Sequence, residues 1–176
     1  LSNGRLYAAD LAYADLRSAD LIDADLRYAD LTDADLGAAD LTDANLRYAD
    51  LINADLENAD LTNAFLQSAN LTNAVLENAD LTDAYLYGAD LTYANLYGAD
   101  LTDALLYNAN LTDADLRYAD LTNALVAADL TNADLRYADL KFADFSSASG
   151  TNSATFTNTY WHQTEWTDGI KYDSNQ

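Results

Sequence analysis

Cysteine, proline and methionine are absent from this chain of 176 residues, and aromatic residues other than tyrosine are few: four Phe and two Trp. Without cysteine the chain has no disulfide framework and no thiolate chemistry. Eight Lys and Arg stand against 30 Asp and Glu, a net charge of −22, which disfavours direct binding to nucleic acid or anionic lipid. No apolar run approaches the ~20 residues that span a bilayer, so we expect no membrane insertion.

A five-residue repeat fills most of the chain. Leu occupies every fifth position from Leu1 to Leu121, Ala lies two places before it from Ala9 to Ala124, and Asp or Asn usually stands between them. A period of five fits neither a helix nor a flat strand. It predicts a chain that turns a corner at every repeat, with Leu and Ala pointing inward and the residue between them pointing outward. Polar turn residues, such as Thr42-Asp43, form the corners.

The exceptions to the repeat indicate the number of sides per coil. The outward residue becomes apolar at Phe65, Tyr85, Leu105 and Leu125, which follow one another at an interval of four repeats. This interval predicts four pentapeptides per coil and about eight coils, although a gene-duplication unit of the same length would give the same spacing. The pattern after Val126 resumes one place early, which predicts a one-residue deletion near 126–130, with a bulge or a tightened corner.

We expect a single domain. A β-helix over residues 1–166 would end in an irregular last coil, 149–166, with a shifted register, and residues 167–176 would form a polar tail. Phe156, Trp161 and Trp166 are expected to cap the core, because the end of a solenoid exposes apolar side chains and unpaired edges. The chain opens at Leu1 already in repeat register, so we expect the native start, with any targeting signal, to be missing.

The run Ala-Asp-Leu-Thr-Asp-Ala-Asp-Leu, which begins at Ala29, resembles the pentapeptide-repeat proteins, and the resemblance covers about nine-tenths of the chain. It implies an all-β fold, a right-handed quadrilateral β-helix (solenoid) with four pentapeptides per coil. Members of the family are abundant in cyanobacteria, and most lack a known biochemical activity. One subgroup inhibits DNA gyrase by imitating duplex DNA. The segment Thr164–Gly169 looks like the ending of some exported members, which favours the periplasm or a lumen over the cytoplasm.

One outward column is acidic. It comprises Asp20, Asp40, Asp60, Asp80, Asp100 and Asp120, which we expect on one face. This candidate acidic face could bind cations or imitate DNA, or Asp could simply be the outward residue that bonds its own backbone. A specific metal site is disfavoured, because calcium needs six to eight oxygens that converge on one point. We expect no cofactor.

A second outward column is apolar and is the candidate protein contact. It comprises Phe65, Tyr85, Leu105 and Leu125, with Tyr87 and Tyr107 beside it. Contiguous exposed apolar patches often mark interfaces, so this column predicts a protein partner or self-association. The alternative is that the C-terminal segment folds over it.

The remaining motifs do not indicate chemistry. Four Arg-Tyr pairs are interpreted as Arg that offset neighbouring Asp rather than as a nucleic-acid site: Arg27-Tyr28, Arg47-Tyr48, Arg117-Tyr118 and Arg136-Tyr137. His162, the single histidine, has no recurring nucleophile beside it, so we expect no enzyme. The sequence therefore predicts a rigid scaffold or protein-interaction rod. The alternative is a DNA-mimicking inhibitor of a DNA-processing enzyme such as gyrase.

Overall fold

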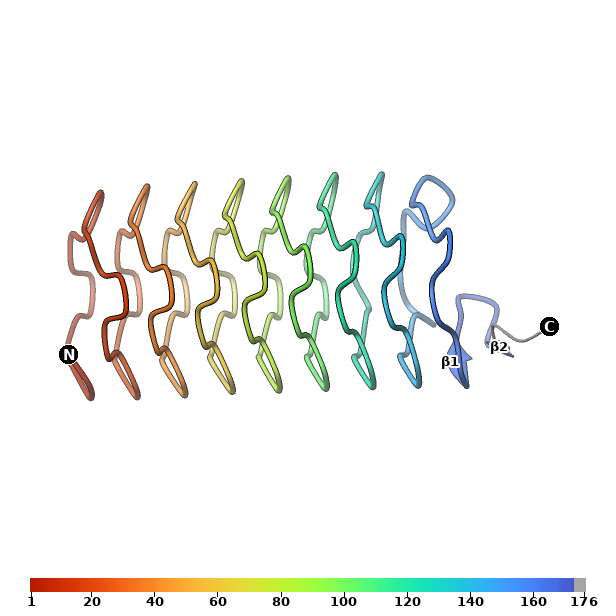
Figure 1. Cartoon of the computed structure of the whole chain (residues 1–176), viewed down its shortest axis with the longest axis horizontal. Coiled ribbons are helices and arrows are strands. Elements are labelled where there is room, and N and C mark those ends of the chain that lie inside the picture. The colour runs from red at the N-terminus through yellow and green to blue at the C-terminus, as the bar shows by residue number, and fades with distance from the viewer. Residues whose placement is uncertain (173–176) are drawn as a thin grey trace.

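The computed structural model, which describes residues 1–172, is a rod of stacked coils (Figure 1). Parallel bridges join residues that lie four repeats apart in the sequence, such as Asp20 to Asp40. Backbone hydrogen bonds flank each bridge: the Leu21 N–H donates to the Asp40 carbonyl at 2.8 Å, and the Asp40 N–H donates to the Ala19 carbonyl at 2.9 Å. Each repeat carries one bridged residue, so each regular coil carries four bridged positions.

Regular strands are almost absent because the bridged residues are isolated between corners. Within residues 1–172 the strands are β1 (Thr164–Glu165) and β2 (Lys171–Tyr172), which pair antiparallel with Glu165 opposite Lys171. The same residues contain no helix, so none of them forms a helix that is long and apolar enough to span a membrane. Part of the expected polar tail thus forms a short hairpin, and its last residues, 173–176, lie outside the described residues.

Each corner is closed by a local hydrogen bond. The Ala24 N–H donates to the Leu21 carbonyl at 3.0 Å, and the same bond recurs along the rod. The second corner residue has a positive φ, 55° at Asp23 and 57° at Asn53. Asn and Asp tolerate this left-handed region better than other residues with a side chain, which explains their frequency at corners.

The core consists of the inward Leu and Ala of every side. From Leu21 to Phe145 the inward residues of the repeat are at most 2% exposed, which confirms the predicted orientation. Fully burying one Leu contributes roughly 1.5–3 kcal/mol. Four such Leu in a coil offset a large part of the conformational entropy that the ordered coil loses.

The missing residue shortens a corner and leaves the sides intact. The chain passes from Val126 to Ala128 without the usual two-residue turn, and the bridge from Leu125 reaches Asp144, one place short of the regular interval. Val126 and Leu130 remain completely buried on either side of the change. The predicted deletion is therefore present as a tightened corner, and the core continues through it.

Aromatic side chains replace Leu at the C-terminal end of the rod. Phe145 is fully buried, and the Trp166 ring centroid lies 5.2 Å from that of Phe145. The Trp166 ring also contacts Phe156 and Trp161, each at 5.0 Å between centroids. The bridge from Asp144 joins Glu165, one place beyond the regular interval, so this coil has a shifted register. Large rings thus fill the end of the core where the repeat weakens.

Leu81 tests the inward assignment. Its side chain is 0% exposed in the middle of the rod, so Leu81→Asp would bury an unpaired charge, and we expect loss of the folded state by far-UV circular dichroism. Leu81→Ala should instead lower the free energy of unfolding by about 2–5 kcal/mol. Asn78→Asp, which adds the same charge at an exposed corner, is the control and should fold normally. A native spectrum for Leu81→Asp would contradict the core described above.

Candidate functional site

Stacking of the coils turns sequence spacing into continuous surface. The outward residue of each pentapeptide belongs to one of four columns, because each is bridged to its counterpart in the next coil. Neighbours within a column are therefore about 4.8 Å apart. Two of the columns contain the residues that the sequence singled out.

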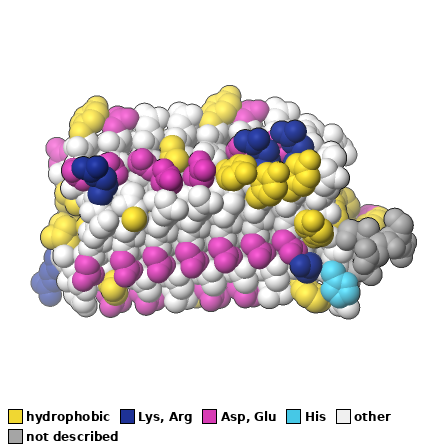
Figure 2. Space-filling view, in the orientation of Figure 1, with side chains coloured by type: hydrophobic (Ala, Val, Ile, Leu, Met, Phe, Trp, Pro, Cys, Tyr) yellow, Lys and Arg dark blue, Asp and Glu magenta, His cyan; other side chains and the backbone are white. Residues whose placement is uncertain are grey.

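The acidic face is one complete column. Consecutive bridges join its members in order: Asp20, Asp40, Asp60, Asp80, Asp100 and Asp120. The column continues to Asp139, which the regular spacing missed because the deletion brings this residue one place nearer to Asp120 in the sequence. Figure 2 shows acidic side chains in such a row along the rod.

Each carboxylate from Asp20 to Asp120 in this column also accepts a hydrogen bond from the backbone of the corner that follows it. Oδ1 of Asp80 accepts the N–H of Thr82 at 2.9 Å. The same bond to the residue two places on is made by Asp20, Asp40, Asp60, Asp100 and Asp120. Asn70 also makes it to Thr72, at 3.2 Å, so this hydrogen bond requires the oxygen and not the charge. Within residues 1–172 no group of three or more acidic, His or Cys side chains could hold a metal ion.

The apolar stripe, defined as Phe65, Tyr85, Leu105 and Leu125, is also a series of consecutive bridge partners. The Phe65 and Tyr85 rings stack with centroids 5.0 Å apart. Beside them at the next corner, the Tyr87 and Tyr107 rings stack at 5.5 Å and are 38% and 40% exposed. The stripe residues themselves are partly exposed. The sequence-predicted contact residues therefore form one connected surface, two columns wide.

The two ends of the stripe carry opposite charges. At the N-terminal end, the Arg47 guanidinium lies over the Phe65 ring, 4.4 Å from its centroid. At the C-terminal end, Leu125 is bridged to Asp144. Neither charge was predicted from the sequence. The shortened interval after the deletion could have placed Asp144 in the column, but nothing in the pattern indicates which way Arg47 extends.

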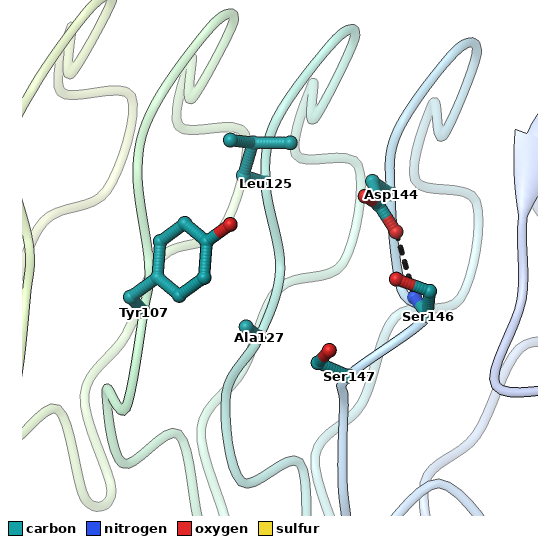
Figure 3. Close-up of a pocket in the computed structure, with 6 residues that line it drawn as sticks. All are labelled: Tyr107, Leu125, Ala127, Asp144, Ser146 and Ser147. Carbon is teal, nitrogen blue, oxygen red and sulfur yellow. Dashed lines mark hydrogen bonds between the residues drawn. The ribbon is translucent and has the colours of Figure 1, made fainter.

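A small recess adjoins the C-terminal end of the stripe (Figure 3). Its volume is about 20 Å³, and it is lined by Tyr107, Leu125, Ala127, Asp144, Ser146 and Ser147. It lies at the tightened corner, where Ala127 has only a methyl group in the place that Tyr87 and Tyr107 occupy in the two preceding coils. Oδ1 of Asp144 accepts the Ser146 N–H at 2.8 Å, which holds the carboxylate at the rim.

The Arg of the Arg-Tyr pairs neutralise adjacent carboxylates, as predicted, with one exception. Arg27 bonds Asp25 at 2.7 Å, and Arg136 bonds Asp134 at 2.5 Å. The hydrogen bond from Arg136 holds the pKa of Asp134 below its ordinary value, against the opposing effect of burial. Arg47 differs, because it follows Asn45 and lies on Phe65 instead.

The Tyr of these pairs stack on one another. Tyr28 and Tyr48 stack with centroids 4.9 Å apart, and so do Tyr118 and Tyr137. Each ring therefore covers one face of its neighbour, and that face is closed to a nucleic-acid base, although the four side chains remain 41–53% exposed. This arrangement supports a packing role. His162 likewise packs its ring edge-on against another ring, 5.1 Å between centroids.

Comparisons with known proteins agree with this architecture. The family model for pentapeptide repeats matches in eight copies, over residues 1–37, 39–78, 69–106, 93–126 and 125–149. No curated protein sequence matches the chain. The chain is 32% identical to HetL, a pentapeptide repeat protein involved in heterocyst differentiation regulation from the cyanobacterium Nostoc sp.; the match covers 98% of this chain and 89% of HetL, with a TM-score of 0.33.

Two further solved structures are similar. QnrB1, a plasmid-mediated fluoroquinolone resistance protein, is 16% identical over 90% of this chain and 89% of its own, with a TM-score of 0.46. A pentapeptide repeat protein from the thylakoid lumen of Arabidopsis thaliana is 28% identical over 70% of this chain and 72% of its own, with a TM-score of 0.24.

The acidic column makes a prediction about stability. Asp80 stands between two like charges, and Asp80→Asn keeps the oxygen that Thr82 requires. We expect the free energy of unfolding to rise by about 0.2–1 kcal/mol, most at low salt, because screening weakens the repulsion. Urea unfolding at two salt concentrations measures this. Asp134→Asn is the control, since it also breaks the ion pair with Arg136 and should give no gain. A loss of stability in Asp80→Asn would show that the column does not repel itself.

Proposed function

Because the chain belongs to the pentapeptide-repeat family, we propose that it is a non-enzymatic, right-handed quadrilateral rod of about eight coils that binds another protein along its apolar stripe. In this proposal residues 1–166 form the rod, 149–166 its irregular last coil and aromatic cap, and 167–176 a polar tail. The observation that carries the proposal is the stripe itself, four consecutive apolar positions in a column that elsewhere carries polar residues such as Asp25, Asn45 and Asp144.

The stripe has properties suited to a binding surface. Contiguous apolar patches on a soluble protein commonly mark interfaces. Hydrogen bonds to the coils on both sides hold the backbone beneath the stripe: the Leu105 N–H donates to the Ala84 carbonyl of the preceding coil, and the Leu106 N–H donates to the Leu125 carbonyl of the following coil. A surface that is already ordered loses little conformational entropy when a partner binds, so more of the contact energy appears as affinity.

The charge of the rod selects the kind of partner. A net charge of −22 attracts basic proteins and speeds their encounter, and it opposes the approach of a second copy. The stripe would then supply the apolar contact once a basic partner has been attracted. We place this binding in an exported compartment, a periplasm or lumen, on the likeness of Thr164–Gly169 to the endings of exported family members.

The acidic face favours a second candidate, a duplex decoy for a DNA-processing enzyme such as gyrase. Its observation is the unbroken run from Asp20 to Asp139, at one carboxylate per coil. Duplex DNA carries one charge per ~1.7 Å of axis. Eight coils at about 4.8 Å give a rod of roughly 38 Å, on which the net charge of −22 reaches nearly the same density. A decoy of gyrase would have to reside in the cytoplasm, so the compartment separates the two candidates.

The stripe proposal is tested by selecting peptides that depend on it. The stripe and Asp144, the next residue of the same column, together span about 20 Å. Random peptides of about eight residues are long enough to cover this distance. A displayed library is selected on the wild-type protein and then assayed on the double variant Tyr85→Thr, Leu105→Thr. We expect binders that contain apolar residues and lose at least about tenfold in affinity on this variant, equivalent to about 1.4 kcal/mol.

Val75→Thr is the matched control, because Val75 is an outward apolar residue in a different column and its loss should leave binding unchanged. Binders that are indifferent to the double variant would contradict the proposal. So would a wild-type protein that sediments as a dimer while the double variant sediments as a monomer, since the stripe would then serve self-association.

The decoy candidate is tested by a gyrase supercoiling assay. If the acidic face imitates DNA, micromolar protein inhibits supercoiling, and inhibition weakens as salt rises because charge contacts are screened. The triple variant Asp60→Asn, Asp80→Asn, Asp100→Asn should inhibit less while keeping its corner hydrogen bonds. Absence of inhibition at low and at moderate salt eliminates this candidate.

A further inference from the structure

We propose that the recess beside Leu125 binds the ammonium group of a lysine on the protein partner, with the partner's apolar side chains lying along the stripe. This inference rests on the proposed function and adds to it a second point of contact of defined chemistry. Its basis is the position, size and charge of the recess.

The recess has room for one small polar group. A volume of about 20 Å³ exceeds the ~10–15 Å³ that one water molecule requires. An ammonium group is of similar size to water, whereas the guanidinium of Arg is a planar fork with five N–H donors. Lysine therefore fits the recess, and arginine would have to remain at its rim.

The lining suits a cation with several hydrogen-bond donors. An ammonium group donates three hydrogen bonds and accepts none. Around the recess stand the Asp144 carboxylate and the hydroxyl groups of Tyr107, Ser146 and Ser147, all of which accept (Figure 3). One Asp144 oxygen is occupied by the Ser146 N–H, and the other makes no hydrogen bond within residues 1–172. No basic side chain lines the recess.

Asp144 also differs from the two outward acids that directly precede it, Asp134 and Asp139. Asp134 forms an ion pair with Arg136, and Asp139 forms one with Lys141, both at 2.5 Å. In each pair the cation lies two places after the acid in the sequence. For Asp144 the equivalent position is Ser146, too short and uncharged to form an ion pair. The carboxylate at the end of the stripe thus lacks the internal cation that Asp134 and Asp139 have, and a cation from outside can take that place.

The recess and the stripe fit a single lysine-containing segment. The four-carbon stem of lysine is apolar and can lie against Leu125 and Ala127 while the ammonium group reaches the carboxylate. A partner that also places apolar side chains over Leu105 and Tyr85 would fill the stripe at the same time. The net charge of −22 favours such a basic partner over a neutral one.

The test uses the peptides selected above. We expect those that depend on the stripe to carry lysine at one fixed position relative to their apolar residues. Asp144→Asn should weaken such a peptide at least about tenfold, since a charge-assisted hydrogen bond is lost. Replacing the lysine by methionine should weaken it on the wild-type protein and have little further effect on Asp144→Asn, because the two groups act as a pair. Replacing the lysine by arginine should also weaken it.

Asp144→Asn retains the oxygen that the Ser146 N–H requires, as Asn110 does for the Thr112 N–H at 3.1 Å, so the variant should fold. Asp90→Asn is the matched control, since it removes the same charge from an equivalent corner in another column and should leave affinity nearly unchanged. This inference alone is overturned if the stripe-dependent peptides carry no lysine at a fixed position. It is also overturned if these peptides lose the same affinity on Asp144→Asn as on Asp90→Asn. Peptides that are indifferent to the stripe overturn the proposed function and this inference together.

Discussion

The parallel backbone hydrogen bonds between coils are the interaction on which the rest of the structure depends. They hold each residue beside its counterpart in the next coil, as Leu21 is held beside Leu41 by the bond from Leu21 to Asp40. This register stacks Leu on Leu and Ala on Ala in the core, and it aligns the outward residues into columns. Neither the acidic face nor the apolar stripe exists without it, because consecutive members of each column are separated by a whole coil in the sequence.

The acidity of the rod arises from a local requirement repeated many times. At each corner that follows an outward Asp or Asn, the side-chain oxygen of that residue accepts the N–H two places on, and Asn70 and Asn110 do this as Asp80 does. Each outward Asp is thus explained without a ligand, yet the register lines the charges up and the net charge of the chain reaches −22. A field of this strength attracts basic partners whether or not any single carboxylate contacts them. The stripe and its recess would then decide where a partner binds.

The single deletion shows how the fold tolerates error. A residue lost from a side would place a polar residue in the core, whereas a residue lost from a corner leaves Val126 and Ala128 buried and only tightens the turn. The result is local: the corner near Ala127 is smaller, and a recess opens beside Leu125. A change that is neutral for the core has therefore altered the surface at one end of the stripe.

The sequence by itself determined the inward Leu and Ala, the corners, the place of the deletion and the membership of both columns up to that deletion, because all of these follow from the five-residue repeat and its recurrence every four repeats. Counting failed where contacts depend on side-chain reach or on the register after the deletion. It did not predict that Arg47 lies over Phe65, that Asp139 extends the acidic face or that Asp144 and the two serines border a recess. Those features belong to the tertiary structure, since each joins side chains from different coils at distances that only the stacked backbone sets.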